Sequence, residues 1–183
     1  MKIVVLNGSP DSRRFELDCY LAELEGLLET RGHVVKSFEL RAMNIGHCTG
    51  CWGCWVKTPG ECVIRDDSQK VCRAAINSDL LLFASPVIMG FTSAVLKKIS
   101  DRLIPLLHPY FEIDRGEIHH RKRYERYPAV GLLLERATDT DEEDLELIRD
   151  IYARMALDFK SELKFTGLTG NPAEEAADAL DRL

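Results

Sequence analysis

Hydrophobic positions along the chain follow two alternating patterns. Short runs of β-branched and other apolar residues, typical of buried parallel strands, occur at 2–6, 79–85 and 129–134. Between these runs, apolar residues recur three and four positions apart, which predicts amphipathic helices. Because the strand and helix patterns alternate along the chain, they predict a parallel sheet covered by helices.

Two weaker strand patterns, at 34–40 and 163–168, complete a set of five. With no internal repeat and no linker between the elements, we expect a single domain over residues 1–183. The expected fold class is α/β: a flavodoxin-like doubly wound sheet of five parallel strands in the order 2-1-3-4-5, with helices on both faces. One of these helices is expected over 94–107, ending near Pro109.

The composition limits the kinds of partner. The 183 residues carry a net charge of −6 and a pI of about 5.4, which argues against nucleic acid as a partner. No apolar run approaches the roughly 20 residues of a membrane-spanning helix, so no membrane association is expected. No secretory signal precedes the first strand, and several cysteines look unpaired, so we expect a cytoplasmic location.

Four cysteines within fifteen residues are the strongest chemical signal. Their spacing is C-x2-C-x2-C-x7-C, in a loop at 46–66 that follows the second strand, and they are Cys48, Cys51, Cys54 and Cys62. Three close thiolates with a fourth further on are typical of iron–sulfur proteins, because four thiolates so placed can surround one metal–sulfur cube. The spacing therefore favours an iron–sulfur cluster.

Other interpretations of the cysteines stay open. Zinc sites usually have two C-x2-C pairs about a dozen or more residues apart, unlike this loop. Disulfides are disfavoured by the expected reducing compartment and by the size of the chain. The thiols could also be free, with no ligand. Cys19 and Cys72 lie in helical patterns, and we expect both to be small buried side chains.

The predicted topology places a ligand crevice. In doubly wound sheets the ligand binds beyond the carboxyl ends of the strands, near the point where the strand order reverses. Here that edge carries the loops that follow residues 6, 84 and 134. Because the cysteine loop also follows a strand, we expect the thiols and the crevice to be neighbours.

Two of these loops have suitable chemistry. The loop at 7–14 combines Gly8, for a tight turn, with serines, arginines and the N–H groups of a following helix, a set that suits a phosphate. A plain capped turn is the alternative, and the loop is neither G-x-G-x-x-G nor a Walker loop. The loop at 85–93 presents apolar residues between Pro86 and Gly90, which suit either a flat heteroaromatic ring or a subunit contact.

Two charged stretches have simpler interpretations. The acidic loop at 135–144 suits a solvated helix N-terminus and would repel an anion. The basic and aromatic stretch at 119–127 is expected to be an exposed or interface loop, which could meet the phosphate of a nicotinamide nucleotide or an acidic partner.

Three segments together resemble the NADPH-dependent FMN reductase and iron–sulfur flavoprotein group. They are IVVLNGSP at 3–10, the cysteine run with Asp66 and Asp67 after it, and ASPVIMGFTSAVLKKISDR at 84–102. The cysteine spacing points to the iron–sulfur branch. The resemblance implies a flavodoxin-like fold, FMN as cofactor, and a homodimer or homotetramer with sites at subunit contacts.

The resemblance also implies residue roles. The four cysteines would ligate a [4Fe-4S] cluster close to the flavin. The residues at the phosphate and the isoalloxazine ring of FMN would be Ser9, Pro10, Ser12, Arg13, Arg14, Pro86, Val87, Ile88, Met89 and Gly90. Where the family usually carries Ser-Asn-Thr before the first helix, this chain has Arg14-Phe15-Glu16, which removes two polar donors and adds a carboxylate.

These observations predict an FMN-dependent oxidoreductase or electron-transfer flavoprotein. FMN accepts a hydride or single electrons and a cluster moves one electron, so together they convert two-electron into one-electron chemistry. NAD(P)H or ferredoxin would be the donor, and a quinone, a flavin or a protein the acceptor; no side chain is predicted to act as acid or base. Two alternatives remain: a non-enzymatic thiolate sensor of metal or redox state, and a simple NAD(P)H:FMN reductase without a cluster.

Overall fold

The computed structural model of the chain describes residues 1–13 and 15–183, with only the backbone of Phe15. Arg14, one of the residues expected at the phosphate, lies outside the described residues.

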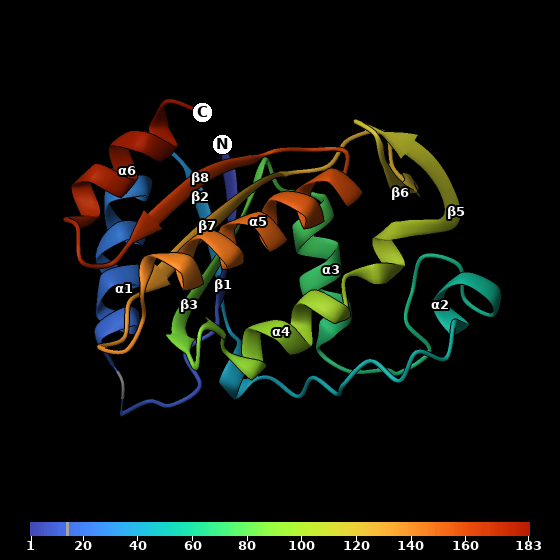
Figure 1. Cartoon of the computed structure of the whole chain (residues 1–183), viewed down its shortest axis with the longest axis horizontal. Helices are drawn as coiled ribbons and strands as arrows, with labels where there is room; N and C mark the ends of the chain where they lie inside the picture. The colour runs from blue at the N-terminus through green and yellow to red at the C-terminus, as the bar shows by residue number, and fades with distance from the viewer. Residues whose placement is uncertain (14) are drawn as a thin grey trace.

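A mostly parallel sheet forms the centre of the molecule (Figure 1). Its strands are β1 (Lys2–Asn7), β2 (Val34–Glu39), β3 (Leu80–Ile88), β4 (Phe91–Thr92), β7 (Ala129–Glu135) and β8 (Leu163–Leu168). The parallel strands run in the order β2-β1-β3-β7-β8, and Ile3 of β1 pairs with Val35 on one side and Leu80 on the other. The apolar, β-branched runs of the sequence thus become strands that are buried on both faces.

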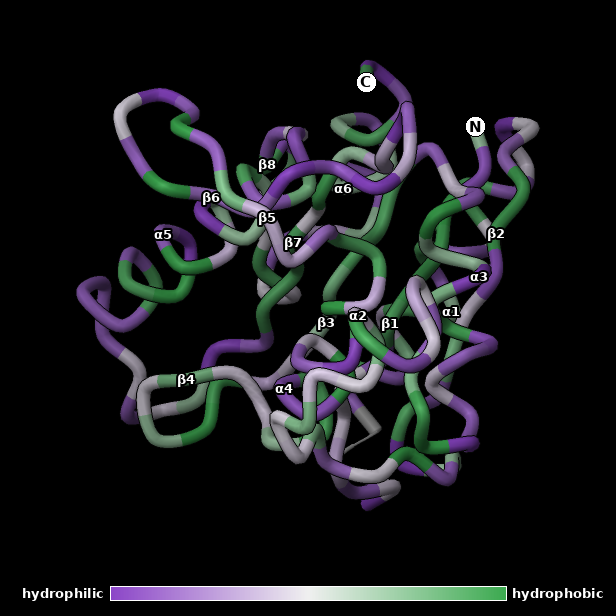
Figure 2. Tube along the Cα trace, turned by 90° about the vertical axis from the view of Figure 1, so that its right-hand side faces the viewer, coloured by the Kyte–Doolittle hydropathy of each residue, from purple (hydrophilic) through white to green (hydrophobic). Residues whose placement is uncertain are grey.

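Helices cover both faces of this sheet (Figure 1). They are α1 (Phe15–Thr30) and α6 (Ala173–Asp181) on one face, and α3 (Ser68–Ile76), α4 (Ala94–Asp101) and α5 (Glu142–Asp158) on the other. Alternate residues of β1 point to opposite faces, so Val5 packs under α1 and Leu6 under α4. Figure 2 shows β1 and β3 in hydrophobic colours at the centre of the molecule. The α/β, flavodoxin-like prediction is confirmed.

The strand count differs from the prediction. The sheet has six strands, because the short β4 pairs antiparallel with the end of β3. A separate hairpin, β5 (Leu107–Asp114) and β6 (Glu117–Lys122), forms a second sheet. Three strands, β4, β5 and β6, lie between β3 and β7 in the chain, so the observed order is β2-β1-β3-β7-β8 in place of 2-1-3-4-5, although the five parallel strands keep the relative order that was predicted. The basic stretch expected as a loop contributes His119–Lys122 to β6.

The helix expected over 94–107 is shorter than predicted. α4 ends at Asp101, and a 3-10 turn, η2 (Ile104–Leu106), leads directly into β5. Pro105 lies at the start of this turn. Proline has no N–H to continue a helix, so it favours the break that the apolar spacing alone did not indicate. Among the described helices, none is both long and apolar enough to cross a membrane.

The cysteine loop runs along one side of the molecule. After β2 the chain passes through η1 (Leu40–Ala42), continues to the short helix α2 (Gly53–Val56), and returns to α3. Figure 1 shows α2 beside the β5–β6 hairpin, at the end of the molecule away from α1. Trp55 fixes α2 there, because its indole Nε1 donates to the carbonyl of Leu107 at 3.0 Å.

Candidate functional site

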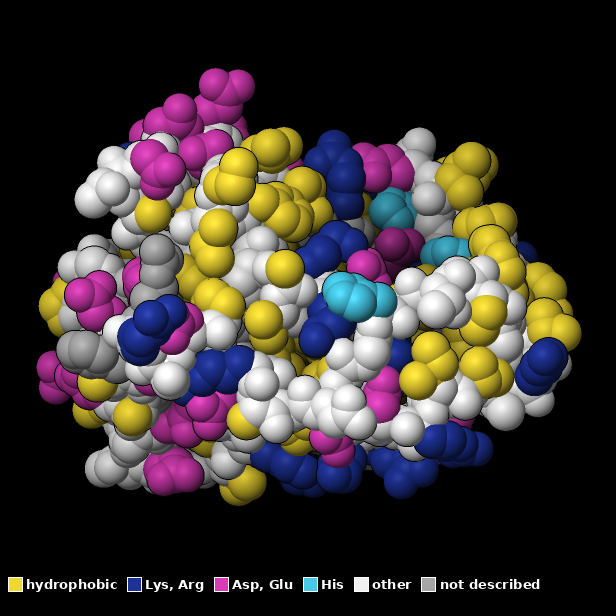
Figure 3. Space-filling model, turned by 90° about the horizontal axis from the view of Figure 1, so that it is seen from below, with side chains coloured by type: hydrophobic (Ala, Val, Ile, Leu, Met, Phe, Trp, Pro, Cys, Tyr) yellow, Lys and Arg dark blue, Asp and Glu magenta, His cyan; other side chains and the backbone are white. Residues whose placement is uncertain are grey.

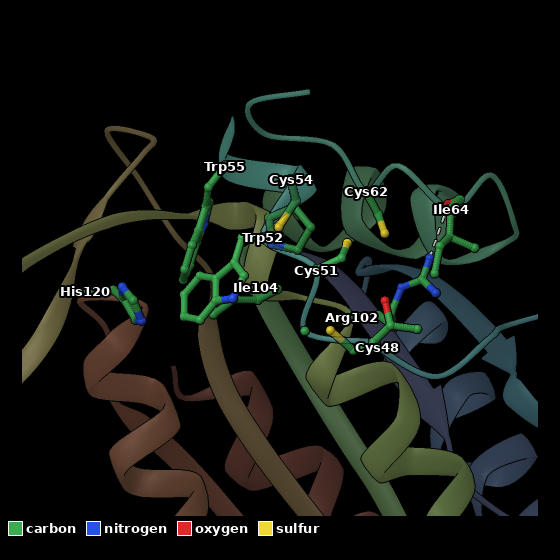
Figure 4. Close-up of a pocket in the computed structure, with 13 residues that line it drawn as sticks. Cys48, Cys51, Trp52, Cys54, Trp55, Cys62, Ile64, Arg102, Ile104 and His120 are labelled. Atoms are coloured by element: carbon green, nitrogen blue, oxygen red, sulfur yellow. Dashed lines mark hydrogen bonds between the residues drawn. The ribbon is translucent and has the colours of Figure 1, made fainter. Parts of the chain in front are cut away.

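The four cysteines of the C-x2-C-x2-C-x7-C run line one cavity of about 310 Å³ (Figure 4). Its remaining wall is largely apolar and aromatic, with Trp52, Trp55, Ile104 and Pro105, and it also includes Arg102 and His120. The cavity is named the thiol pocket below. The structure thus brings together all four residues expected to bind metal.

The backbone of the loop is shaped so that the thiols converge. Trp52 and Gly50 both have positive φ, at 60° and 63°. Glycine takes this conformation without cost, whereas a tryptophan rarely does. Gly53 packs so tightly that an added Cβ would lie 2.6 Å from a methyl group of Val63. The loop therefore combines close backbone packing at Gly53 with an uncommon backbone conformation at Trp52.

The thiols differ in how readily they ionise. A hydrogen bond from the backbone N–H of Gly53, and a second from Thr49, lower the pKa of Cys51. Burial raises the pKa of Cys54, and the neighbouring Cys62, Cys48 and Cys51 raise it further, because thiolates repel one another. The four sulfur atoms are thus close enough to interact electrostatically, and a cationic group bound among them would relieve their repulsion.

The donor set of the thiol pocket is four free thiols. All six cysteines of the chain are free of disulfide bonds. Within residues 1–13 and 15–183, no three His, Cys, Asp or Glu side chains are grouped so as to hold a metal ion. A single zinc ion needs thiolates about 2.3 Å from one point, whereas thiolates around a cluster bind separate irons. Thiolates are the ligand type that iron–sulfur clusters use, so the chemistry of the four side chains is compatible with such a group.

Arg102 and Asp66 hold both ends of the cysteine loop. The guanidinium of Arg102 donates to the carbonyls of Gly46 at 2.9 Å and Ile64 at 3.3 Å. It also donates to Asp66 at 3.0 Å and to the hydroxyl of Ser68 at 2.7 Å. Asp66 in turn accepts the backbone N–H of Gly46 at 3.0 Å. Residues 46 and 64 flank the four cysteines, so this network fixes the segment that carries them.

A second cavity lies at the carboxyl ends of β1, β3 and β7, as the topology predicted. It measures about 370 Å³ and is lined by Arg13, Glu16, Pro86, Val87, Glu135, Arg136, Ala137 and Thr138. It is named the crevice below. Residues of the three expected loops meet there, with the start of α1 beside them, and its volume is within the range of small-molecule sites.

The loop at residues 7–14, called the first loop below, is tightly packed where it leaves β1. The N–H of Gly8 donates to the carbonyl of Ala84 at 2.8 Å, and the hydroxyl of Ser93 donates to the carbonyl of Gly8 at 2.5 Å. Ser9 is buried, and its hydroxyl donates to the carbonyl of Asp11 at 3.3 Å. Pro10 and Ser12 are exposed.

The charge of the first loop is partly balanced within the loop. Arg13 is exposed and pairs with Asp11 at 2.7 Å. This pairing raises the pKa of Arg13, mainly through the hydrogen bond to Asp11. The guanidinium nevertheless lines the crevice, together with the exposed carboxylate of Glu16. A phosphate could therefore meet the cation and the α1 N-terminus, but with a carboxylate close by.

The expected ring-binding loop is a β-hairpin. Pro86, Val87 and Ile88 continue β3, and the turn is formed by Met89 and Gly90, which have φ of 50° and 71°. Val87 is buried in the core, whereas Met89 is 92% exposed. Of the five residues, Pro86 and Val87 line the crevice. This arrangement was missed because an apolar run gives no sign of where a strand ends.

The thiol pocket and the crevice are separate, contrary to the expectation that they are neighbours. Among the described residues they share no lining residue, and α2 and the first loop lie toward different ends of the molecule in Figure 1. The physical reason is the Arg102–Asp66 network, which holds the loop beside the C-terminal end of α4. A third cavity, of about 540 Å³, lies beside Cys48 and is also lined by Phe91, next to the β3–β4 turn.

Several residues of the thiol pocket were not expected from the sequence. Arg102 is 1% exposed, and His120, Ile104 and Pro105 come from segments assigned to a helix or a loop. A signal for Arg102 existed, because it follows Ile99 by three positions and so continues the apolar face of α4 just beyond the end of the helix. Cys19 was expected to be buried and is exposed.

The chain is similar in sequence to several known proteins. The iron-sulfur flavoprotein of Archaeoglobus fulgidus is 37% identical over 113 residues, which cover 59% of this chain and 48% of that protein. The iron-sulfur flavoprotein of Methanosarcina thermophila is 27% identical over 181 residues, which cover 96% of this chain and 85% of that protein. The chain spans about half the length of the Archaeoglobus fulgidus relatives it matches.

A solved structure and a family model complete the comparison. The azoreductase of Bacillus anthracis superposes with a TM-score of 0.67 at 13% identity, covering all of both chains, which supports the fold alone. The family model for NADPH-dependent FMN reductase matches residues 1–122, the part that contains the crevice loops after β1 and β3 and all four cysteines. The chain therefore belongs to the NADPH-dependent FMN reductase family.

Proposed function

We propose that this chain is an FMN-dependent oxidoreductase that binds FMN in the crevice and holds an iron–sulfur cluster on Cys48, Cys51, Cys54 and Cys62. The observation that carries the proposal is the convergence of these four thiols on one cavity of a fold whose crevice suits a phosphate. FMN supplies hydride and single-electron chemistry, and a cluster passes one electron at a time.

The chain's own residues position and shield these groups. Arg13 and the α1 N-terminus would hold the FMN phosphate, and Pro86 and Val87 would border the flavin. In the thiol pocket, Trp52 and Trp55 lie with ring centroids 5.1 Å apart and form an apolar wall beside the sulfur atoms. Such a wall would lower the polarity beside a bound cluster and so influence its reduction potential.

The donor and acceptor belong to the same proposal. NAD(P)H is proposed as the donor because the family to which the chain belongs is that of the NADPH-dependent FMN reductases. A ferredoxin is the alternative donor, and a quinone, a flavin or another protein is the acceptor. Steady-state oxidation of NADH, NADPH and reduced ferredoxin by the same preparation would distinguish the donors.

A homo-oligomer is also proposed. Figure 3 shows hydrophobic side chains gathered at the end of the molecule formed by α2 and the β5–β6 hairpin. In the hairpin, the side chains of Ile113 and Ile118 are 79% and 73% exposed. On α2, Val56 is 78% exposed. Apolar area of this kind is typical of protein interfaces. Sedimentation of the wild type and of Ile113→Glu would test whether this end buries a subunit contact.

The test of the main proposal is a spectrum of protein purified without oxygen. We expect flavin absorption together with broad iron–sulfur absorption, and iron and acid-labile sulfide in equal amounts. Cys51→Ala should remove the iron–sulfur absorption and leave the flavin. Cys19→Ala is the matched control, because Cys19 lies on α1, outside the thiol pocket, and should change neither. Protein that stays colourless after FMN and anaerobic iron and sulfide are added would contradict the proposal.

The separation of the two cavities favours one second candidate, a simple NAD(P)H:FMN reductase whose thiols play no part. The crevice contains no cysteine among its lining residues, so flavin chemistry there does not require the thiol pocket. If replacement of all four cysteines by alanine leaves NADPH oxidation and electron delivery to every acceptor unchanged, this second candidate is correct.

A further inference from the structure

Arg136 is the only basic residue in the acidic stretch 135–144, which the sequence predicted would repel an anion. In the structure its side chain nevertheless lines the crevice. Two of the acidic residues further along the stretch, Asp141 and Asp144, are engaged elsewhere, because they form the capping box of α5. The crevice therefore has a second guanidinium besides that of Arg13.

The guanidinium of Arg136 is held in place by its own loop. Its Nε donates to the carbonyl of Thr140 at 3.1 Å, and its Nη1 donates to Glu142 at 2.6 Å. Thr140 is buried, and its hydroxyl accepts the N–H of Ala137 at 3.1 Å, which closes the loop. Glu142 is 81% exposed, so water screens its carboxylate and the charge of Arg136 is only partly offset. Arg136 is thus a positioned cation on one wall of the crevice.

The sheet order separates Arg136 from the proposed phosphate site. The first loop follows β1 and Arg136 follows β7, and β3 lies between these two strands. Two strand spacings place the ends of β1 and β7 roughly 10 Å apart. Pro86 and Val87, from the end of β3, line the space between them. FMN carries its phosphate and its ring at opposite ends of a ribityl chain. With the phosphate at Arg13 and the start of α1, Arg136 therefore faces the ring end.

From this arrangement we propose that Arg136 lies at the flavin-ring end of the crevice and stabilises the reduced, anionic form of FMN. The inference rests on the proposed FMN site, and adds to it a residue that sets the balance between the two oxidation states. Like the FMN site itself, it requires no ligand in the thiol pocket.

The chemistry of flavin reduction gives the reason for this role. NAD(P)H transfers a hydride to N5 of the ring and leaves as NAD(P)⁺, so the flavin gains two electrons and one proton. The ring, neutral when oxidised, then carries one negative charge, shared by N1 and the C2 carbonyl oxygen. A fixed guanidinium attracts this anion more strongly than the neutral ring, and therefore favours reduction. Glu16 and Glu135 also line the crevice, so the effect of Arg136 is measured as a difference between variants that keep both carboxylates.

The experiment is an anaerobic titration of the FMN-loaded protein with dithionite, in the presence of a dye of known potential and followed by flavin absorption. At a fixed ambient potential, Arg136→Gln should lower the ratio of reduced to oxidised flavin by about three- to tenfold. Arg136→Lys keeps the charge but not the Nε–H bond to Thr140, so it should lower the ratio by less. Arg154→Gln is the matched control, because Arg154 lies on α5, outside the crevice, and should change nothing.

Glu142→Gln separates a charge effect from a loss of structure. Both Glu142→Gln and Arg136→Gln remove the 2.6 Å contact between these side chains. A loosened loop would therefore shift the ratio in the same direction in both variants. Removal of charge shifts it in opposite directions, so Glu142→Gln should raise the ratio of reduced to oxidised flavin.

Riboflavin, which lacks the phosphate, separates the ring from the phosphate. The shift caused by Arg136→Gln should be the same for riboflavin as for FMN. Arg13→Gln should instead weaken the binding of oxidised and reduced FMN alike and leave riboflavin unaffected. If Arg136→Gln behaves as Arg13→Gln is expected to, Arg136 binds the phosphate and the inference is overturned.

Thermal unfolding is measured for each variant. If Arg136→Gln does not fold, Arg136→Lys and Glu142→Gln still decide the question, because their expected shifts are opposite. Shifts of the same sign, or no shift in any folded variant, overturn the role of Arg136. A wild-type protein that binds neither FMN nor riboflavin contradicts the proposed function instead, so the two failures are distinct.

Discussion

Arg102 and Asp66 form a buried ion pair, 3.0 Å between Nη2 and Oδ1, that closes the cysteine loop at both ends. The arginine binds the carbonyls of Gly46 and Ile64, and the aspartate binds the N–H of Gly46. Each side chain is at most 5% exposed. The geometry of the thiol pocket therefore depends on one charge pair that belongs to two distant parts of the chain.

This pair should make stability depend on acid pH. Burial alone would raise the pKa of Asp66, but hydrogen bonds from Ser68 and Gly46 and the charge of Arg102 outweigh burial and lower the pKa. A carboxyl group with a lowered pKa contributes its full stability above the unfolded pKa of about 3.9, and loses it as the pH falls through the folded value. Asp66→Asn should therefore reduce the free energy of unfolding by roughly 3–5 kcal/mol at pH 7.

Urea unfolding at pH 7, 5 and 3 measures the effect, and the difference from wild type should shrink below a pH of about 3.9. Asp101→Asn is the control, because Asp101 pairs with Lys97 on the surface of α4 and both are about half exposed. Exposed pairs contribute at most about 1 kcal/mol. A loss of equal size in the two variants, or a loss at Asp66 that does not diminish in acid, would contradict the prediction.

Much of the fold could be predicted because its strands are buried on both faces. Val5, Leu82 and Leu132 belong to apolar runs, and such runs identify central parallel strands without further information. The crevice followed from the same patterns, because the loops after parallel strands meet at one edge. The four thiols could be assigned to one site because their spacing limits how far apart they can lie.

The remaining features depend on contacts between distant segments. The extension of β3 to Ile88 requires its pairing with Phe91, and the hairpin is anchored where His119 meets Asp158 of α5 at 3.0 Å. Neither contact can be predicted from the spacing of apolar residues within one segment. The position of the thiols away from the crevice depends on Arg102, whose role is visible only once α4 and the loop are seen together.

Gly8 should be essential at the end of β1. A Cβ there would lie 2.7 Å from the Cβ of Leu96 and 2.8 Å from the carbonyl oxygen of Ala84, neither of which is the free end of a flexible side chain. Gly8→Ala should cost about 1–3 kcal/mol of stability and weaken FMN binding, because the first loop would shift. Thermal unfolding and titration of flavin fluorescence check both effects.

The matched change is Gly26→Ala, in the exposed part of α1, where an added Cβ meets nothing within 4 Å. That variant should gain about 0.5–1 kcal/mol, because alanine restricts the unfolded chain and favours the helix. If the two alanine variants have the same stability, the close approach of Gly8 to α4 does not affect the free energy of unfolding and the prediction is wrong.

Glu16 should weaken FMN binding through its charge. It is exposed and lines the crevice with Arg13, where a phosphate is proposed to bind. Glu16→Gln should increase FMN affinity by about two- to fivefold at low salt, and Arg13→Ala should reduce it, because like charges repel and opposite charges attract across solvent. Fluorescence quenching of FMN measures both affinities.

Riboflavin separates this electrostatic effect from a change in pocket shape, because it has the same ring and no phosphate. Neither variant should alter riboflavin affinity, and added salt should reduce both FMN effects. Equal changes for FMN and riboflavin would mean that Glu16 contacts the ring or reshapes the crevice, and the phosphate would then have to bind elsewhere.

Trp55 should anchor α2 and the thiols to the hairpin. Its indole N–H donates to Leu107, and its ring lies 5.1 Å from the rings of both Trp52 and His120. Trp55→Phe keeps a ring but removes the hydrogen bond, so we expect a loss of about 1 kcal/mol in local stability. Trypsin should then cleave faster after Lys57, which is exposed just beyond α2. Trp52→Phe is the control, because Trp52 is 63% exposed. Equal acceleration in both variants would show that ring contacts, and not the bond to Leu107, hold α2 in place.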